Sequence, residues 1–146
     1  MIEVKEKIGM TFEEFTFTIE RGKIREFAKA IGDDNPIYYD IEAAKKAGFR
    51  DIPIPPTFPT VIEMWAGADF DQLIQLLNLN PLKVLHGEQK YEYFGDICAG
   101  DEITGRTTVI NAENKKEMNF ITLQTNYKNK DGQTVLVAQS VVIEKQ

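Results

Sequence analysis

The chain has 146 residues, of which 42% are hydrophobic and 27% are charged, and its formal net charge is -6. This length fits a single domain, residues 1–146, that is large enough to bury a hydrophobic core. Lys and Arg are spread along an acidic chain, which excludes the basic surface of a nucleic-acid-binding protein. No apolar stretch is long enough to span a bilayer, and the first residues have no apolar segment of signal-peptide length, so we do not expect secretion. With one cysteine, Cys98, we expect a cytoplasmic protein.

The N-terminal part predicts a strand followed by a helix. Apolar and polar residues alternate over residues 14–19, as in a half-buried strand. A turn is expected at Arg21 and Gly22. The apolar residues of the next segment have the spacing of one helical face, and Gly32 has the position of a C-terminal cap. These residues are Ile24, Phe27, Ala28 and Ile31.

The next part predicts two helices joined by a stiff segment. Asp40 is a plausible N-cap of a helix that runs through Ala47. Prolines then recur over residues 53–59 and favour extended backbone until Thr57 or Pro59 begins the next helix. Residues 60–79 carry few charges and predict a long, mostly buried helix that is bent near Gly67. Its expected buried face consists of Val61, Met64, Trp65 and Ala68.

The second half predicts strands in close succession. Residues 83–94, 102–111, 119–128 and 134–144 are rich in β-branched and aromatic residues. Turns are expected at residues 99–101 and 112–114, and Asp131-Gly132 is typical of a hairpin. One predicted strand precedes the long helix and four follow it. The pattern favours an α+β fold with an antiparallel sheet of about five strands.

The stretch from Gly32-Asp33-Asp34-Asn35-Pro36 to the proline-rich turn that ends at Phe58 resembles the signature of the MaoC-like, (R)-specific enoyl-thioester hydratases. The resemblance runs from about Phe15 to the C-terminus. It implies a hotdog fold, in which a sheet wraps around a long central helix. It also implies chemistry that adds water to, or removes it from, an acyl thioester of coenzyme A or a carrier protein, without a cofactor or a metal.

Two positions depart from the family signature. The resemblance places the catalytic aspartate on Asp33, whereas Tyr38 stands where the family has its histidine. The family's Ala-His-Gly step is replaced by Ile54-Pro55-Pro56. The run from Leu85 to Tyr93, which includes His86, is followed by Ala99-Gly100-Asp101 and resembles the N-terminal-half branch of the family. In that branch, the resemblance implies a partner domain that supplies the working Asp and His.

The candidate catalytic residues are Asp33, Tyr38 and His86. An aspartate can act as a base, whereas a tyrosine, with a reference pKa near ~10, is a poor base and a better hydrogen-bond donor. Each has a structural interpretation as well: Asp33 as a turn former, Tyr38 as a packed ring, and His86 as part of a bulge in which Glu88 orients it. Unpaired amides at the start of the helix after Pro56 are candidate oxyanion donors.

The candidate substrate-binding residues are Asn35, Pro56, Thr57, Phe58 and Trp65, with Phe70 and Leu73 as further walls of an acyl tunnel. Core packing is the alternative for the aromatic members. Cys98 is interpreted as a packing residue. The chain has one His and one Cys, too few for a typical zinc site, so we expect no metal.

Three functions stay open on the sequence. The first is a dehydratase subunit that lacks the histidine and pairs with a His-bearing MaoC-like chain. The second is a self-sufficient homodimeric hydratase that uses Asp33 with Tyr38 or His86. The third is an acyl-thioester-binding module or a hotdog thioesterase. The resemblance implies a dimer in each case.

Overall fold

The structure, a computed structural model, describes residues 4–68 and 70–145. Five antiparallel strands form one sheet in the order β1-β3-β4-β5-β2. The predicted α+β class and strand number are confirmed. The strands are β1 (Phe15–Thr18), β2 (Val84–Tyr93), β3 (Glu102–Lys115), β4 (Met118–Lys128) and β5 (Thr134–Lys145). The helices are α1 (Arg21–Ala30), α2 (Ile41–Lys46), α3 (Pro59–Trp65) and α4 (Phe70–Leu77), with short 3-10 helices at η1 (Val4–Lys7), η2 (Pro36–Tyr38) and η3 (Pro81–Lys83).

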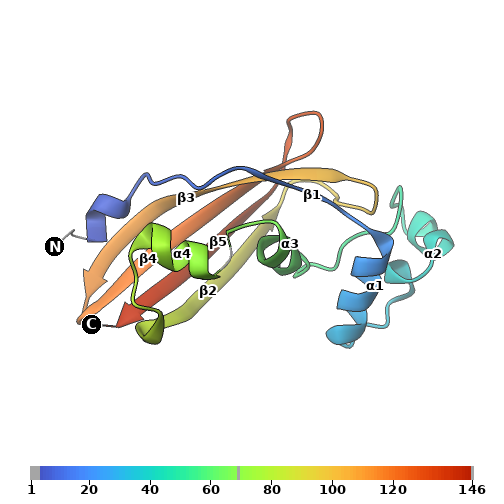
Figure 1. The fold of residues 1–146 in the computed structure, drawn as a ribbon. Helices are drawn as coiled ribbons and strands as arrows, with labels where there is room; N and C mark the ends of the chain where they lie inside the picture. Colours follow the sequence, from blue (N-terminus) through green and yellow to red (C-terminus); the bar gives the residue numbers. More distant parts are fainter. Residues whose placement is uncertain (1–3, 69, 146) are drawn as a thin grey trace.

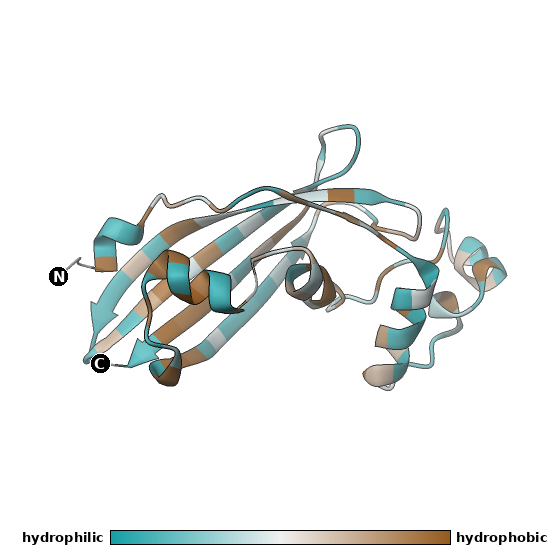
Figure 2. Cartoon of the chain, viewed as in Figure 1, coloured by the Kyte–Doolittle hydropathy of each residue, from teal (hydrophilic) through white to brown (hydrophobic). Residues whose placement is uncertain are grey.

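The helices are distributed unevenly around the sheet. Figure 1 shows α3 and α4 lying across one face of the sheet, with α1 and α2 gathered beyond one end of it. Apolar and polar residues alternate along the strands in Figure 2, as expected for a sheet with one covered face. On β4 the covered face carries alternate buried residues, namely Ile121, Leu123, Thr125 and Tyr127.

Two hydrophobic clusters lie between the helices and the sheet. The larger joins α1, the proline-rich segment and α3 to one end of the sheet, and it contains the fully buried Ile24, Phe58 and Tyr127. The smaller joins the N-terminal segment and the end of α4 to the other end, and it contains Phe12 and Leu77. Residues of both clusters line a shared cavity against the sheet.

The first predicted helix differs from expectation at both ends. The turn expected at Arg21 and Gly22 is instead the first turn of α1. Ile24 and Ala28 are buried as predicted, whereas Ile31 is 48% exposed. Ile31 is exposed because α1 ends at Ala30 and the backbone leaves the helix axis, with Gly32 at a φ of +74°.

The long helix predicted over residues 60–79 is divided into two short helices, α3 and α4. The bend expected near Gly67 is a break between the two helices, and α3 ends at Trp65. Position 67 has no room for a side chain, since a Cβ there would lie 2.9 Å from the carbonyl oxygen of Glu63. The predicted buried face is wrong for its two largest members: Met64 and Trp65 are 72% and 73% exposed. Ile62 and Pro59 are the fully buried residues of α3.

The strands of the second half are confirmed to within a few residues, with one turn displaced. The turn expected at residues 112–114 lies further on, because β3 continues to Lys115. The reversal occurs at Lys116 and Glu117, which both have positive φ and connect β3 to β4 in a two-residue hairpin. The hairpin at Asp131-Gly132 is confirmed, with Gly132 at a φ of +78°. Among the described residues, no helix combines the length and apolarity needed to cross a membrane.

Candidate functional site

The loop after α1 holds the predicted catalytic aspartate. The amide of Asp33 donates to the carbonyl of Ala28 and that of Gly32 donates to Lys29, which closes the helix end in a Schellman arrangement. The Asp33 carboxylate, through Oδ1, then accepts the backbone N–H of Asn35 at 3.0 Å. Asp33 therefore acts locally as a turn former, as the structural interpretation predicted.

Further hydrogen bonds fix this loop. Asn35 Oδ1 accepts the N–H of Ile37 at 3.2 Å and caps η2, so its side chain has a structural task beside the predicted substrate contact. The hydroxyl of Tyr39 donates to the carbonyl oxygen of Asp33 at 2.6 Å. The Arg25 guanidinium lies 5.7 Å from the centroid of the Tyr39 ring. The loop is held by both its own side chains and α1.

Tyr38, at the position where histidine was expected, is a core residue that is 7% exposed. Burial raises the pKa of its hydroxyl, and the nearby charge of Asp33 raises it further. A phenol that is harder to ionise than usual can donate a hydrogen bond but cannot serve as a base near neutral pH. Tyr38 lines a pocket of 240 Å³ together with Pro56 and Tyr93.

The proline-rich segment forms another wall of this pocket. The hydroxyl of Tyr93 donates to the carbonyl oxygen of Pro56 at 2.7 Å, which ties β2 to the segment. Thr57 is exposed, whereas Phe58 is fully buried and contacts Phe27 edge to face, with ring centroids 5.6 Å apart. Phe58 is thus placed in the core, the alternative weighed for it.

Several of the first amides of this helix, expected as oxyanion donors, are used within the chain. The N–H of Phe58 donates to Pro55, that of Thr60 to Thr57, and that of Val61 to Phe58. These three donors belong to the tight turns that lead into α3, so the oxyanion role stays a prediction for the amide of Thr57.

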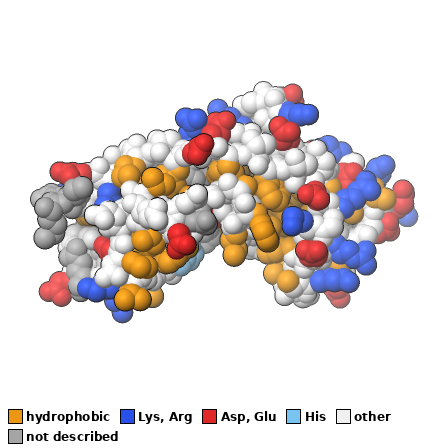
Figure 3. All heavy atoms as spheres, in the orientation of Figure 1, with side chains coloured by type: hydrophobic (Ala, Val, Ile, Leu, Met, Phe, Trp, Pro, Cys, Tyr) orange, Lys and Arg blue, Asp and Glu red, His pale blue; other side chains and the backbone are white. Residues whose placement is uncertain are grey.

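The predicted wall residue Trp65 lies on the outside of the single chain. Its ring is 73% exposed and carries the Lys23 ammonium 5.0 Å from its centroid. Met64 beside it is equally exposed. Figure 3 shows hydrophobic side chains gathered over the middle of the molecule, while charged side chains surround α1 and α2.

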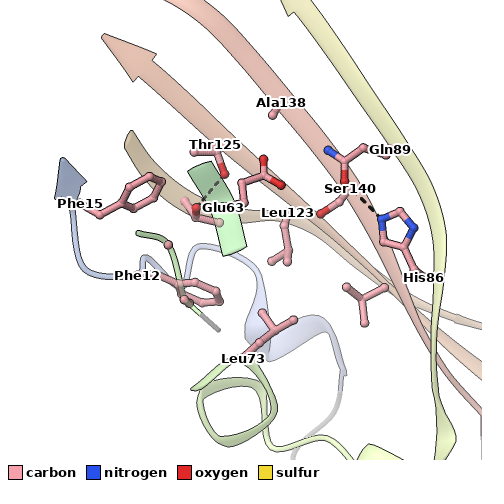
Figure 4. A pocket seen from close by; sticks show the side chains of 14 residues that line it. Phe12, Phe15, Glu63, Leu73, His86, Gln89, Leu123, Thr125, Ala138 and Ser140 are labelled. Carbon is pink, nitrogen blue, oxygen red and sulfur yellow. Dashed lines mark hydrogen bonds between the residues drawn. The ribbon is translucent and has the colours of Figure 1, made fainter. Parts of the chain in front are cut away.

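A second cavity, of 180 Å³, lies between the helices and the covered face of the sheet. Its apolar wall includes Phe12, Phe15, Leu73 and Leu123. Its polar lining comes from α3 and from four strands: Glu63, His86, Gln89, Thr107, Thr125 and Ser140. Figure 4 shows the side chains of Glu63 and Thr125 close together at one end and His86 with Gln89 at the other.

Glu63 is the residue in this cavity that the sequence reasoning missed. Its Oε1 accepts a hydrogen bond at 3.1 Å from the hydroxyl of Tyr127, which is fully buried. Burial raises the pKa of Glu63 to about 7, against which the hydrogen bond from Tyr127 acts. The sequence offered one signal, an acidic residue in the otherwise uncharged run from Pro53 to Ala68, which is unusual for a helix that is packed on a sheet.

His86 is exposed on β2 at the irregularity that was predicted there. The β2–β5 register shifts between His86 and Glu88, which confirms the bulge. The orienting partner is Gln89 rather than Glu88: His86 Nε2 lies 3.3 Å from Gln89 Oε1. The shift at the bulge brings His86 and Gln89 to the same side of the sheet. His86 lines the second cavity, whereas Tyr38 lines the first, so the structure does not bring these two candidates together.

The remaining sequence candidates have structural surroundings. Cys98 is completely buried, and its backbone N–H donates to Asp101 Oδ2 at 3.0 Å. Burial raises the pKa of its thiol. In the described part of the chain, no group of three His, Cys, Asp or Glu side chains is placed to hold a metal ion.

Comparison with known proteins gives sequence relatives that cover most of the chain. Residues 6–138 match the family described as FAS1-like, dehydratase domain region. A UPF0336 protein of Thermobifida fusca is 35% identical over 127 residues, which cover 87% of this chain and 83% of that protein. A UPF0336 protein of Streptomyces avermitilis is 44% identical over 93 residues, covering 64% and 61% of the two chains.

Solved structures share the fold at low sequence identity. One chain of the C-terminally truncated HadBC (3R-hydroxyacyl-ACP dehydratase) complex of Mycobacterium tuberculosis has a TM-score of 0.84 and 20% identity, with 97% of this chain and 99% of that chain covered. A MaoC-like dehydratase has a TM-score of 0.89 and 21% identity, covering 99% of this chain and 44% of that one. The (R)-hydratase of A. caviae has a TM-score of 0.71 and 18% identity, covering 95% and 96%. The predicted hotdog fold and the MaoC-like resemblance are confirmed.

Proposed function

The chain belongs to the family of FAS1-like dehydratase domains, and we propose that it is a subunit of an (R)-specific 3-hydroxyacyl-thioester dehydratase that lacks the catalytic histidine and works with a His-bearing MaoC-like partner. The observation that carries the proposal is the burial of Tyr38. Its ring is buried in the core and burial raises the pKa of its hydroxyl, at the position where the resemblance expects an imidazole.

The dehydration reaction requires a group that exchanges protons near neutral pH, and position 38 lacks one. Dehydration of a 3-hydroxyacyl thioester needs a base for the α-proton and an acid for the leaving hydroxyl. A histidine exchanges protons near neutral pH, whereas a buried phenol holds its proton. The Asp33 carboxylate, for its part, already accepts the N–H of Asn35. Asp33 and Tyr38 of this chain are better suited to shaping the loop than to moving a proton.

Two surfaces support an association with a second chain. Strand β2 lies at an edge of the sheet, and within the described chain it pairs only with β5. A ten-residue edge strand leaves backbone donors and acceptors for a neighbouring sheet. Exposed apolar side chains accompany it, including Leu85 and Phe94 on and after β2, and Trp65 on α3. Similar folds occur in structures described as the HadBC and ChsH1-ChsH2 complexes.

In the proposed complex, the partner provides the base and the acid, and this chain provides part of the wall that holds the acyl thioester. Pro56 in the Tyr38 pocket, the exposed Thr57 that follows it, and Trp65 on the uncovered face of α3 are the residues we assign to that wall. The self-sufficient alternative, which uses Asp33 with Tyr38 or His86, has less support, because the Tyr38 hydroxyl holds its proton and His86 lines a different cavity from Tyr38.

Hydration of trans-2-enoyl-CoA tests the proposal. The purified chain is assayed alone and together with a His-bearing MaoC-like chain from the same genome, with the molecular mass of each sample recorded. We expect no turnover from this chain alone, a mixed complex, and turnover from that complex. Turnover by this chain alone would contradict the proposal. Release of free thiol from saturated acyl-CoA would instead favour the thioesterase alternative.

A matched pair of substitutions identifies which chain performs the chemistry. Asp33→Asn in this chain keeps the side-chain oxygen that accepts the N–H of Asn35, so the loop should stay folded. We expect the complex to retain its rate within about twofold. The corresponding Asp→Asn change in the partner's own Gly-Asp motif should abolish turnover. Loss of activity from the Asp33 change in a folded complex would assign the proton transfer to this chain.

A further inference from the structure

The cavity between α3, α4 and the sheet is large enough for a ligand and is lined by two kinds of surface. Its volume is 180 Å³. At about 30 Å³ for each water-sized group, it holds a chain of about six carbon atoms. Phe12, Phe15, Leu73 and Leu123 line part of it, which suits an aliphatic chain. The exposed His86 also lines it, so the cavity extends to the surface of β2.

The cavity also has polar groups, and a purely aliphatic chain would form no hydrogen bonds with them. Glu63 Oε1 accepts from Tyr127, and the described residues give the second carboxyl oxygen of Glu63 no hydrogen bond. Thr107 Oγ1 and Thr125 Oγ1 lie 2.7 Å apart. Since one of these hydroxyls donates to the other, the pair keeps one further O–H to offer.

Packing an unsubstituted alkyl chain against these polar groups would be unfavourable. A polar group that is taken out of water without a partner loses its hydrogen bonds to water and gains none in return. An occupant that carries a hydroxyl avoids this loss, because a hydroxyl both donates and accepts. It can accept from a protonated Glu63 or from the threonine pair, and it can donate to an ionised Glu63. A carbonyl group would match only the donors.

We propose that this cavity binds the distal part of an acyl chain that carries a hydroxyl group, and that Glu63, with Thr107 and Thr125, selects that chain over an unsubstituted one. This distal hydroxyl is a second one, in addition to the hydroxyl that the dehydration removes. The inference rests on the proposed function for the acyl ligand, and it adds the substrate class. Glu63 is a specificity residue in this scheme, since it contacts the distal chain and not the reacting carbons.

The geometry of the sheet supports a chain that runs along the strands. Thr125 faces Ala138 across β4 and β5, and Val142 faces His86 across β5 and β2. All four residues line the cavity. Residues 138 and 142 are four positions apart on β5, roughly 13 Å along the strand. Glu63 and His86 therefore mark two separated ends, and an extended ligand between them would place its hydroxyl at the Glu63 end.

Binding measurements test the inference without requiring turnover. Isothermal titration compares saturated acyl-CoA thioesters with their ω-hydroxy counterparts, in steps from about six to about ten carbons. We expect one length at which the hydroxylated ligand binds about five- to tenfold more tightly, the difference made by one added hydrogen bond. If every hydroxylated ligand binds more weakly than its saturated partner, the inference is wrong while acyl binding stands. If neither series binds to this chain or to its complex with the partner, the proposed acyl function fails as well.

Substitutions locate the effect in the cavity. Glu63→Met keeps a similar volume without oxygen atoms, so it should remove the preference for the hydroxylated ligand and leave the saturated ligand within about twofold. Glu63→Gln keeps a donor and an acceptor and should retain the preference. Thr125→Val should reduce it by a few-fold. Glu26→Gln, an exposed change on α1 away from the cavity lining, is the control and should alter nothing. A preference that survives Glu63→Met in a folded protein would overturn the assignment.

Amide chemical shifts provide a second readout if Glu63→Met unfolds the chain. In the unsubstituted protein, the hydroxylated ligand should perturb the amides of Thr107, Thr125 and Ala138 more than those around Tyr38. Perturbation confined to the Tyr38 pocket would overturn the proposed location.

Discussion

The Tyr127 hydroxyl donates to Glu63 Oε1 across 3.1 Å and joins α3 to the C-terminal end of β4. The two residues are 64 positions apart in the chain. Tyr127 is fully buried, and burial together with Glu63 raises the pKa of its hydroxyl well above the usual value. The pair therefore keeps the Tyr127 proton and leaves the Glu63 carboxyl as the group that titrates.

Glu63 should make the stability of the protein depend on pH. Its pKa is about 7 in the folded chain, against a usual value of 4.5. Because the folded chain holds this proton more tightly than the unfolded chain, the free energy of unfolding should fall as pH rises from about 4.5 to about 7, and then level off. The loss is of the order of 3 kcal/mol. Urea unfolding of the wild type and of Glu63→Gln, below about pH 5 and above about pH 8, measures the difference. The Glu63→Gln variant should lack this decrease. Glu92→Gln, an exposed change on β2, should keep it. An equal decrease in all three proteins would contradict the prediction.

Gly105 on β3 should tolerate no side chain. A Cβ there would lie 2.5 Å from Cζ of Phe15 and 3.0 Å from Cε1 of Tyr127, whose rings already pack edge to face at 5.9 Å. We expect Gly105→Ala to destabilise the protein by about 1–3 kcal/mol through overpacking. Gly22→Ala is the matched control, because nothing lies within 4 Å of a Cβ at that position in α1. The control should instead stabilise by about 0.5–1 kcal/mol, since alanine is the better helix former. Thermal unfolding of both variants measures the two opposite shifts.

The hydrogen bond between Thr60 and Tyr91 should couple α3 to β2. Their hydroxyl oxygens lie 2.7 Å apart, and burial raises the pKa of Tyr91 to about 12. We expect Thr60→Val and Tyr91→Phe each to cost about 1 kcal/mol, and the double variant to cost little more than either single one. Chemical denaturation of the four proteins completes the double-mutant cycle. Additive losses would show that the two hydroxyls contribute independently.

Cys98 should react with a thiol reagent only when the protein opens. Its side chain is completely buried and burial raises the pKa of its thiol, so both access and the thiolate fraction are low. Labelling of the native protein should be slower than labelling in denaturant by at least about a hundredfold. Where labelling requires global unfolding, the rate should increase in the Gly105→Ala variant about tenfold for each ~1.4 kcal/mol of lost stability. Fast labelling of the native protein would show a local opening around Cys98 that the packing does not predict.

The sequence predicted the strands well because their signals are local. β-branched and aromatic runs mark β2 to β5, and Gly132 marks a hairpin where a positive φ is required. The turn between β3 and β4 was missed because it uses Lys116 and Glu117 at positive φ, residues that carry no turn signal of their own. A local rule fails where the hairpin is imposed by the pairing of the flanking strands.

The candidate site was predicted in part. The Gly-Asp-x-Asn-Pro motif located the loop, and its turn chemistry is visible in the bonds of Asp33 and Asn35. The surroundings of Tyr38 and His86 were not predictable, because each depends on which distant strand or loop lies against it. The roles assigned to these residues stay predictions until the assays described above are made.

The amino-acid sequence by itself determined the class of fold, which follows from residue types and their spacing, and the family, which follows from the resemblance of its motifs; the same resemblance identified Tyr38 at the position of the family's histidine. Only the tertiary structure decided which side of α3 is buried. A helical period of 3.6 residues sets which side chains share a face but not which face meets the sheet. In this chain that choice exposes Met64 and Trp65 and places Glu63 beside Tyr127. The cavity and its carboxyl group exist because of that packing.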